Sequence, residues 1–330
     1  MIAVEEVNNP CCICGQHDST VLFETLFERW RYNRQFVMRK CCGCGLLFNS
    51  PRLPQEELKD HYNDDYYIFK RKDVDSIIRV IPIYLRTLRL IEKDVEEKTV
   101  LDIGSSKGYF PALLKRLGWE AEGVEISEKS ARFGMEQFGV NAFVGTLDKY
   151  RMGGCREFSV ITAIDVLEHV PDPAAFVNDL VGVCKSGNYV IIDTPNGRAY
   201  HIQHQKDQWR GFNPYHIYLF TCENLVHLLE ERGCRIVHRF TYNNIYPTPA
   251  DAKEPFPLKY PFWDLLHVPF FGRRLRRKDV HSLNVDEIFR LSAFTARRSK
   301  EFFDTPDAMG PLAKACEGEN LVVIAQKCGD

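Results

Sequence analysis

The sequence predicts an α/β fold, a mostly parallel sheet with helices on both faces, preceded by a small cysteine-rich module. From residue 99 onward, β-prone runs alternate with helix-like patterns, as expected when parallel strands are joined by covering helices. Before residue 51, cysteines gather in two tight clusters. A chain of 330 residues with 45% hydrophobic content has room for one full α/β domain with additions.

The first 50 residues contain two Cys-x-x-Cys-Gly sequences, at residues 11–15 and 41–45. Two such pairs supply four thiolates that can converge tetrahedrally on zinc, and the glycines let backbone N–H groups turn toward sulfur. The residues between the pairs fit a hairpin. Disulfides are the alternative, and a reducing compartment disfavours them. We expect a structural zinc ribbon over residues 1–50, and its expected ligands are Cys11, Cys14, Cys41 and Cys44.

Residues 51–98 form the expected helical linker. Between Ile81 and Val95, apolar residues recur at steps of three and four, which places them on one face of an amphipathic helix. We expect this face to pack against the domain that follows.

The central stretch of the chain begins at residue 99, where a β-prone run meets a Gly/Ser turn that opens into a helix-like pattern. Such a turn lets a ligand approach the backbone, because glycine has no Cβ and a helix N-terminus offers unpaired N–H groups. The dinucleotide fingerprint requires glycines at relative positions one, three and six. Here these positions hold Gly104, Ser106 and Tyr109, and an acid, Asp102, lies inside the strand end.

The remaining elements follow in the same alternation. Further strands are expected at 119–125, 141–145, 158–165, 188–193, 234–240 and 321–326, with helices at 109–117, 128–138 and 173–184. A last helix begins at Thr221 as N-cap and is expected to end at Gly233.

The glycine turn resembles the first motif of class I S-adenosylmethionine-dependent methyltransferases, Asp-x-Gly-x-Gly-x-Gly, with serine in the middle glycine position. Glu125 ends the next strand, 21 residues after Gly104, where an acid can accept both ribose hydroxyls. The resemblance implies a Rossmann-like methyltransferase domain over 99–330, with an insertion at about 241–318 before an antiparallel final strand. It implies that S-adenosylmethionine is held by Asp102, Gly104, Ser106, Gly108, Glu125, Ile126, Thr146, Leu147 and Asp165.

Two further segments resemble the acceptor side of known methyltransferases. Residues 165–173 resemble the Asp-x-Leu-Glu-His-x-x-Asp-Pro segment of small-molecule enzymes, including the ubiquinone-type methyltransferases. Residues 215–220 resemble a segment of methyltransferases with an N-terminal zinc module, best known as deoxysugar C-methyltransferases, in which a histidine and a nearby tyrosine transfer the proton. The resemblance implies catalytic roles for His216 first, His169 second, and Tyr215. His169 could equally satisfy loop backbone, and His216 could be structural.

The expected function is methyl transfer to a carbon, oxygen or nitrogen atom of a small molecule, in carbohydrate or secondary-metabolite biosynthesis. A net charge of −2 gives no global field that would recruit nucleic acid. The chain shows no signal peptide and no apolar run long enough to span a membrane, so a cytoplasmic protein is expected. The alternatives are an RNA methyltransferase that docks its substrate with the zinc ribbon and a non-catalytic interaction protein that still binds the cofactor. The insertion could be a lid, an anion-binding or membrane-interface surface, or a solvated basic turn.

Overall fold

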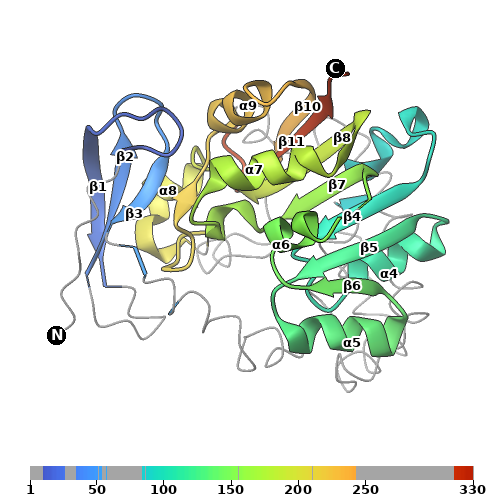
Figure 1. The fold of residues 1–330 in the computed structure, drawn as a ribbon. Helices are drawn as coiled ribbons and strands as arrows, with labels where there is room; N and C mark the ends of the chain where they lie inside the picture. Colours follow the sequence, from blue (N-terminus) through green and yellow to red (C-terminus); the bar gives the residue numbers. More distant parts are fainter. Residues whose placement is uncertain are drawn as a thin grey trace, which may run out of the picture.

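The computed structural model in Figure 1 describes residues 10–26, 35–50, 52–53, 57, 84–85, 87–154, 156–209, 211–242 and 316–329. A small sheet at the N-terminal end lies beside a large α/β domain. Most of the predicted linker and nearly all of the predicted insertion at 241–318 lie outside the described residues.

The large sheet has seven strands in the order β10-β11-β8-β7-β4-β5-β6. The strands are β4 (Thr99–Ile103), β5 (Glu120–Glu125), β6 (Asn141–Val144), β7 (Phe158–Ile164), β8 (Cys184–Pro195), β10 (Cys234–Tyr242) and β11 (Asn320–Lys327). Strands β4 to β8 pair in parallel, whereas β11 lies antiparallel between β8 and β10. The predicted parallel sheet and antiparallel final hairpin are therefore confirmed. Strand order reverses between β4 and β7, where open α/β sheets bind ligands at the carboxyl ends of their strands.

Helices cover both faces of this sheet (Figure 1). The helices are α4 (Tyr109–Arg116), α5 (Glu128–Phe138), α6 (Leu147–Met152), α7 (Pro173–Gly182), α8 (Tyr200–Gln205) and α9 (Cys222–Glu230), and the 3₁₀ turns are η2 (Glu92–Asp94), η3 (Leu167–His169) and η4 (Lys206–Gln208). The predicted N-cap Thr221 is confirmed, because its hydroxyl accepts a hydrogen bond from the Asn224 N–H in a reciprocal capping box. The helix ends at Glu230 with Glu231 as its C-cap, so Gly233, predicted as the C′ residue, lies one position further on, where its φ of +70° turns the chain into β10.

The small sheet has the strand order β1-β2-β3-β9. The predicted hairpin between the two cysteine pairs is formed by β1 (Ser19–Thr25) and β2 (Phe36–Cys41). Its other strands, β3 (Leu47–Ser50) and β9 (Tyr218–Leu219), were not predicted. Leu47 pairs with Leu219 and Phe48 with Tyr218, so a segment from the far end of the α/β domain completes the N-terminal sheet.

One hydrophobic core joins the two sheets. Phe36 and Met38 of β2, with Leu46 just before β3, are buried in the same cluster as Phe212 and Ile217 of the segment that leads into β9. Because burial of apolar side chains is the main favourable term in folding, this shared core fixes the small sheet to the α/β domain.

Three residues of the predicted apolar face, Leu88, Ile91 and Val95, are buried as predicted, while Ile81 lies outside the described residues. Leu85, Leu88, Ile91 and Val95 are buried in a second core cluster, against Val100 and other residues of the α/β domain. Among the described residues, no helix has the length and apolar character needed to cross a bilayer.

Candidate functional site

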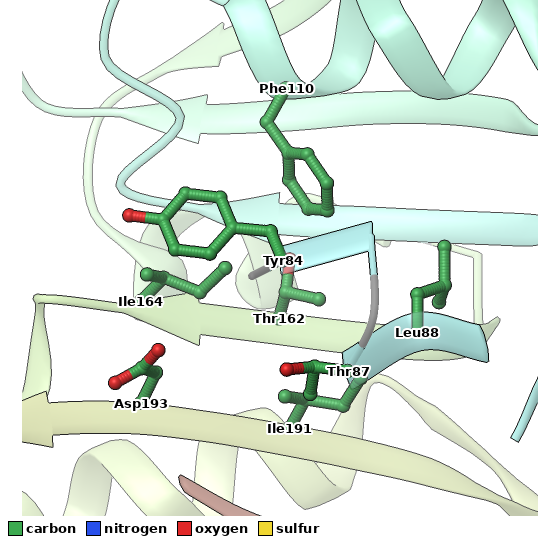
Figure 2. A pocket seen from close by; sticks show the side chains of 8 residues that line it. All are labelled: Tyr84, Thr87, Leu88, Phe110, Thr162, Ile164, Ile191 and Asp193. Carbon is green, nitrogen blue, oxygen red and sulfur yellow. The ribbon is translucent and has the colours of Figure 1, made fainter. Parts of the chain in front are cut away.

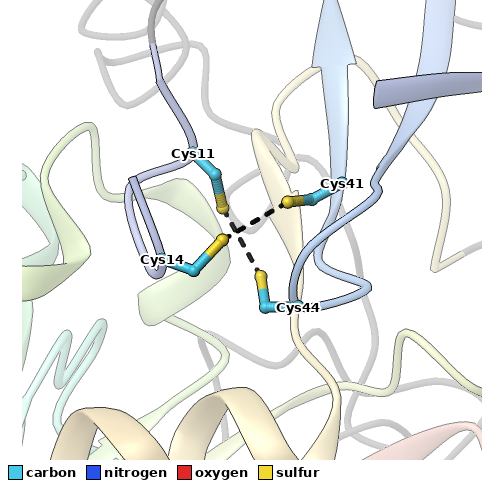
Figure 3. A group of neighbouring side chains, drawn as sticks. All are labelled: Cys11, Cys14, Cys41 and Cys44. Carbon is cyan, nitrogen blue, oxygen red and sulfur yellow. Dashed lines mark hydrogen bonds between the residues drawn. The ribbon is translucent and has the colours of Figure 1, made fainter. Parts of the chain in front are cut away.

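The four predicted metal ligands converge at the N-terminal end of the molecule (Figure 3). The Sγ atoms of Cys11 and Cys44 lie 3.5 Å apart, as do those of Cys14 and Cys41. Two sulfur atoms bound at about 2.3 Å to one tetrahedral zinc ion lie slightly less than 4 Å apart, so the cluster could hold zinc with little movement. None of the described cysteines forms a disulfide.

The two cysteine pairs adopt the same turn. In each turn the glycine N–H donates to the carbonyl of the first cysteine, from Gly15 to Cys11 at 2.8 Å and from Gly45 to Cys41 at 3.1 Å. Gly15 and Gly45 have φ of +70° and +75°, values that a residue with a Cβ adopts only at a cost. Gly15 and Gly45 therefore allow both turns to close, with their own N–H groups bonded to carbonyl oxygen.

The predicted cofactor loop joins β4 to α4 at the carboxyl edge of the large sheet. Gly104 and Gly108 have φ of +74° and +73°, and a Cβ on Gly104 would lie only 2.4 Å from Cγ2 of Val166. Ser106 also has positive φ, +51°, although serine resists this conformation at a cost of about 1 kcal/mol or more. The loop thus keeps the shape of a glycine loop even where serine replaces glycine.

Glu125 ends β5 and holds this loop in place. Its Oε2 accepts a hydrogen bond from the Ser106 N–H at 2.7 Å, and its Oε1 accepts one from the Ser127 N–H at 2.8 Å. Burial raises the pKa of the Glu125 carboxyl, and these backbone bonds oppose the shift because they stabilise the charged form. The carboxyl group therefore lies beside the glycine loop, where the sequence predicts contact with a ribose.

The other predicted cofactor residues lie along the same edge of the sheet. Ile126 is exposed just after β5, and Thr146 is the N-cap position of α6, followed by the buried Leu147. Asp102 is buried in β4, two residues before Gly104, and its Oδ1 accepts a 2.6 Å hydrogen bond from the Thr162 hydroxyl. Burial raises the pKa of Asp102 to about 7. The Asp102 side chain is thus tied to β7, while Ile126 remains open to solvent.

Asp165 begins the loop that follows β7. It has φ of +52°, and its N–H donates to the carbonyl of Asp193 at the end of β8 at 2.9 Å. Burial raises the pKa of the Asp165 carboxyl to about 6. Val166, the next residue, is the one packed against Gly104, so the loop after β7 touches the glycine loop directly.

The two predicted catalytic histidines meet at a buried carboxylate. The rings of His169 and His216 lie 4.7 Å apart, centroid to centroid, in an edge-to-face arrangement. Oε1 of Glu168 lies 3.8 Å from Nε2 of His169 and 4.0 Å from Nε2 of His216. Glu168 is fully buried, and burial together with the charge of Asp165 raises the pKa of its carboxyl. We call these three residues the Glu-His-His cluster.

Backbone carbonyls fix both imidazole rings. Nδ1 of His169 donates to the carbonyl of Tyr215 at 3.0 Å, and Nδ1 of His216 donates to the carbonyl of Gly211 at 2.7 Å. A carbonyl only accepts, so Nδ1 carries the proton in each neutral ring and Nε2 keeps its lone pair. Tyr215, predicted to be catalytic, contacts His169 through this carbonyl.

Three residues that the sequence analysis did not single out position the Glu-His-His cluster. The Thr194 hydroxyl donates to Oε2 of Glu168 at 2.9 Å. The side-chain amide of Asn49, on β3, donates to the carbonyls of His216 at 2.9 Å and Asn213 at 3.3 Å. The Asn213 carboxamide in turn accepts the N–H groups of Tyr215 and His216. The small sheet therefore holds the segment that carries His216.

A separate small pocket lies between the linker and the large sheet (Figure 2). Its lining residues are Tyr84, Thr87, Leu88, Phe110, Thr162, Ile164, Ile191 and Asp193. It includes neither the glycine loop nor the two histidines, so the site they define lies elsewhere on the strand edge.

The chain is similar in sequence to known methyltransferases. Residues 81–239 match a family model described as a methyltransferase domain. The chain is similar to the ubiquinone biosynthesis O-methyltransferase of Hydrogenovibrio crunogenus, 22% identical over 182 residues, which cover 54% of this chain and 68% of that protein. The protein of the same name from Thiobacillus denitrificans is 33% identical over 107 residues, 31% of this chain and 46% of that protein. The chain spans about half the length of several of these curated relatives.

Two solved structures share the fold. An S-adenosylmethionine-dependent methyltransferase from Archaeoglobus fulgidus superposes with a TM-score of 0.50 at 19% identity, covering 80% of this chain and all of that chain. A chain from the complex between the Haloferax volcanii Trm112 methyltransferase activator and a putative methyltransferase also gives 0.50, at 11% identity, covering 83% of this chain and 98% of that chain.

Proposed function

We propose that this chain, which contains a class I S-adenosylmethionine-dependent methyltransferase domain, transfers the methyl group of S-adenosylmethionine to a small-molecule acceptor. The observation that carries the proposal is the contact between Gly104 of the glycine loop and Val166 of the loop that leads into the Glu-His-His cluster. It brings two groups to the same edge of the sheet. One is the glycine loop from Gly104 to Gly108 with Glu125, which we call the cradle, and the other is the Glu-His-His cluster. The carbohydrate or secondary-metabolite context expected from the sequence is part of this proposal.

The residues of the cradle fit S-adenosylmethionine. Backbone N–H groups at the start of α4 and the left-handed glycines leave room for the methionine part beside Asp102. Glu125 is aimed at the same loop and has lone pairs besides the two used by Ser106 and Ser127, so it can accept ribose hydroxyls. Thr146 and Leu147 would flank the adenine.

Methyl transfer from a sulfonium requires the protein mainly to align the methyl donor with the acceptor. The methyl group on the sulfonium is already activated, so the site must align donor and acceptor and exclude water. An acceptor that loses a proton also needs a group that favours its ionised form, and the Glu-His-His cluster is the group placed for this role. His216 is the first candidate to act on the acceptor, and His169 is the second.

The cysteine cluster completes the proposal. We propose that Cys11, Cys14, Cys41 and Cys44 bind one zinc ion, because their sulfur atoms already approach the spacing of a tetrahedral site. Four cysteine ligands leave no position open for water, so the zinc is structural. We also propose that the protein works in the cytoplasm, where a reducing environment keeps its remaining cysteines as thiols.

Methyl transfer to candidate hydroxylated, amino and C–H acidic small molecules, followed by mass spectrometry as a gain of one methyl group, tests the proposal. With the acceptor identified, His216→Ala should slow methyl transfer by roughly 10²- to 10⁴-fold, the range for loss of an acid–base group. Affinity for S-adenosylmethionine should stay near that of the wild type, since His216 lies outside the cradle. A smaller loss in His169→Ala would assign that residue to loop support. Full turnover in His216→Ala would remove it from the reaction.

A further inference from the structure

We propose that Glu168, His169 and His216 form a second metal site, which binds a divalent cation and uses it to activate an oxygen acceptor. This inference rests on the methyl transfer proposed above and narrows its acceptor to a molecule that presents a hydroxyl group. It also assigns the activating role within the Glu-His-His cluster to the cation, held by the two imidazoles, rather than to a free imidazole.

The first argument is the direction of the ligand atoms. One carboxylate oxygen and two Nε2 atoms converge, with Oε1 of Glu168 lying 3.8 and 4.0 Å from the two nitrogens. All three ligand atoms lie within 4.8 Å of one another. Metal bonds to imidazole nitrogen and carboxylate oxygen are about 2.0–2.2 Å long, so two ligand atoms at a tetrahedral or octahedral angle on one cation lie about 3.0–3.5 Å apart. The three atoms can therefore share one cation once the side chains close in by roughly 0.5–1 Å, which rotation about their side-chain bonds allows.

The second argument is the hydrogen bonding behind the ligand atoms. Each Nδ1 donates to a backbone carbonyl, of Tyr215 for His169 and of Gly211 for His216. Histidines that bind metals through Nε2 almost always donate their other ring N–H in this way, which fixes the tautomer and the ring. On the carboxylate side, Thr194 holds Oε2 of Glu168 and leaves Oε1 turned toward the imidazoles. The orientation suited to a cation thus exists before any cation binds.

The third argument is charge. Glu168 is fully buried, and its Oε1 forms no hydrogen bond in the part of the chain that the structure describes. The buried carboxyls of Asp165 and Asp193 lie near enough to act on it electrostatically. No lysine or arginine among the described residues forms an ion pair with Glu168. A cation supplies the missing positive charge, since a buried carboxylate is stable only when paired or bound to metal.

The donor set indicates the kind of cation and its use. Two imidazoles and one carboxylate suit a divalent first-row metal ion with positions left open, and bind Mg²⁺ and Ca²⁺ less well. The side chains of His169 and His216 are 21% and 12% exposed, so the site opens toward solvent on the histidine side. An acceptor hydroxyl bound at an open position would have a lowered pKa, as metal-bound water does.

The reaction then balances without any oxidant or reductant. The acceptor hydroxyl, bound to the cation, releases its proton to water. The alkoxide or phenolate oxygen attacks the methyl carbon, and a C–O bond forms as the C–S bond breaks. The electron pair of that bond returns to sulfur, which converts the sulfonium to a neutral thioether.

Titration with Mn²⁺, followed by electron paramagnetic resonance of the free ion, tests the site without substrate or cofactor. The full chain is used with its zinc retained, since hard Mn²⁺ competes poorly for four thiolates. The wild type should bind one Mn²⁺ per chain, and Glu168→Gln and His216→Asn should each weaken binding at least tenfold. His201→Asn is the matched control, a mostly buried histidine of α8 outside the cluster, and should bind as the wild type does.

Circular dichroism and zinc content identify variants that fold, and His169→Asn replaces any variant that does not. Absence of a Mn²⁺ site in the wild type, or binding unchanged in the folded cluster variants, would overturn the metal site and leave the proposed methyl transfer intact. Methyl transfer that proceeds equally with and without the added metal would overturn the activating role. Mn²⁺ binding in a protein that fails to bind S-adenosylmethionine would contradict the proposed function while supporting the site.

Discussion

The side chain of Asn49 should control the acceptor side of the site from the N-terminal sheet. Its amide donates to the carbonyls of His216 at 2.9 Å and Asn213 at 3.3 Å, while its backbone N–H donates separately to Ile217 at 3.0 Å. Asn49→Ala removes the two side-chain bonds and keeps the backbone bond. Asn49→Asp places a carboxylate oxygen against the same carbonyls, so it should be the more damaging change.

The magnitude follows from these two bonds. A neutral hydrogen bond contributes about 0.5–1.5 kcal/mol, and a buried carbonyl left unpaired adds to the loss. Asn49→Ala should therefore lower the free energy of unfolding by about 1–3 kcal/mol. Because the lost bonds restrain His216, methyl transfer should slow by roughly 10- to 100-fold, the scale of a small misplacement of a reacting group.

Denaturant unfolding, calorimetry with S-adenosylmethionine and methyl-transfer rates separate the effects. Affinity for S-adenosylmethionine should stay within about twofold of the wild type, because Asn49 does not touch the glycine loop. Asn188→Ala is the control. Asn188 lies near the start of β8, and its side-chain amide donates only a local hydrogen bond, to the Ser186 carbonyl. If Asn49→Ala retains both the stability and the rate of that control, the small sheet does not position His216.

Three further predictions concern the cofactor, the zinc and the dependence on pH. Glu125→Ala removes the acceptor of the Ser106 and Ser127 N–H groups, and should weaken S-adenosylmethionine binding by about 1.5–3 kcal/mol in calorimetry; unchanged affinity would remove Glu125 from the site. Serine at Cys11, Cys14, Cys41 or Cys44 should abolish the bound zinc and lower the melting temperature, and zinc-free wild-type protein purified without chelators would refute the ligand set. Asp102 has a pKa raised from its usual value near 4 to about 7, so the folded state holds its proton longer and stability should fall as pH rises from about 4 to 7. Urea unfolding of Asp102→Asn should lose that part of the pH dependence, and an unaltered profile would assign it to other groups.

Much of the fold could be predicted because it depends on local patterns. Alternating β and α segments specify a parallel sheet, and the position of Glu125 at the end of the second strand follows from that alternation. Each cysteine pair and the glycine after it form a turn whose shape is determined by these few adjacent residues. The elements that were missed are short or non-local. Strand β9 has two residues, Tyr218 and Leu219, and its pairing with β3 leaves no periodicity in the sequence.

The proposed cofactor and metal residues belong to sequence patterns that can be recognised, whereas the residues that support them do not. Glu168 lies in a 3₁₀ turn, and a sequence does not reveal that its carboxylate is buried between two imidazoles. Asn49 resembles any polar residue at a strand end, and its partners lie in a segment far along the chain. The positive φ of Ser106 is also hidden, because serine normally avoids this conformation. Tertiary contacts alone determine these roles.

The central claim is that this domain binds S-adenosylmethionine in the cradle between Gly104 and Glu125 and donates its methyl group. Isothermal titration of the full chain with S-adenosylmethionine tests this most directly, with Glu125→Ala measured in parallel. We expect saturable binding of one molecule per chain that weakens roughly 10- to 100-fold in the variant, the equivalent of about 1.5–3 kcal/mol. Absence of binding to the folded, zinc-loaded wild type would contradict the account.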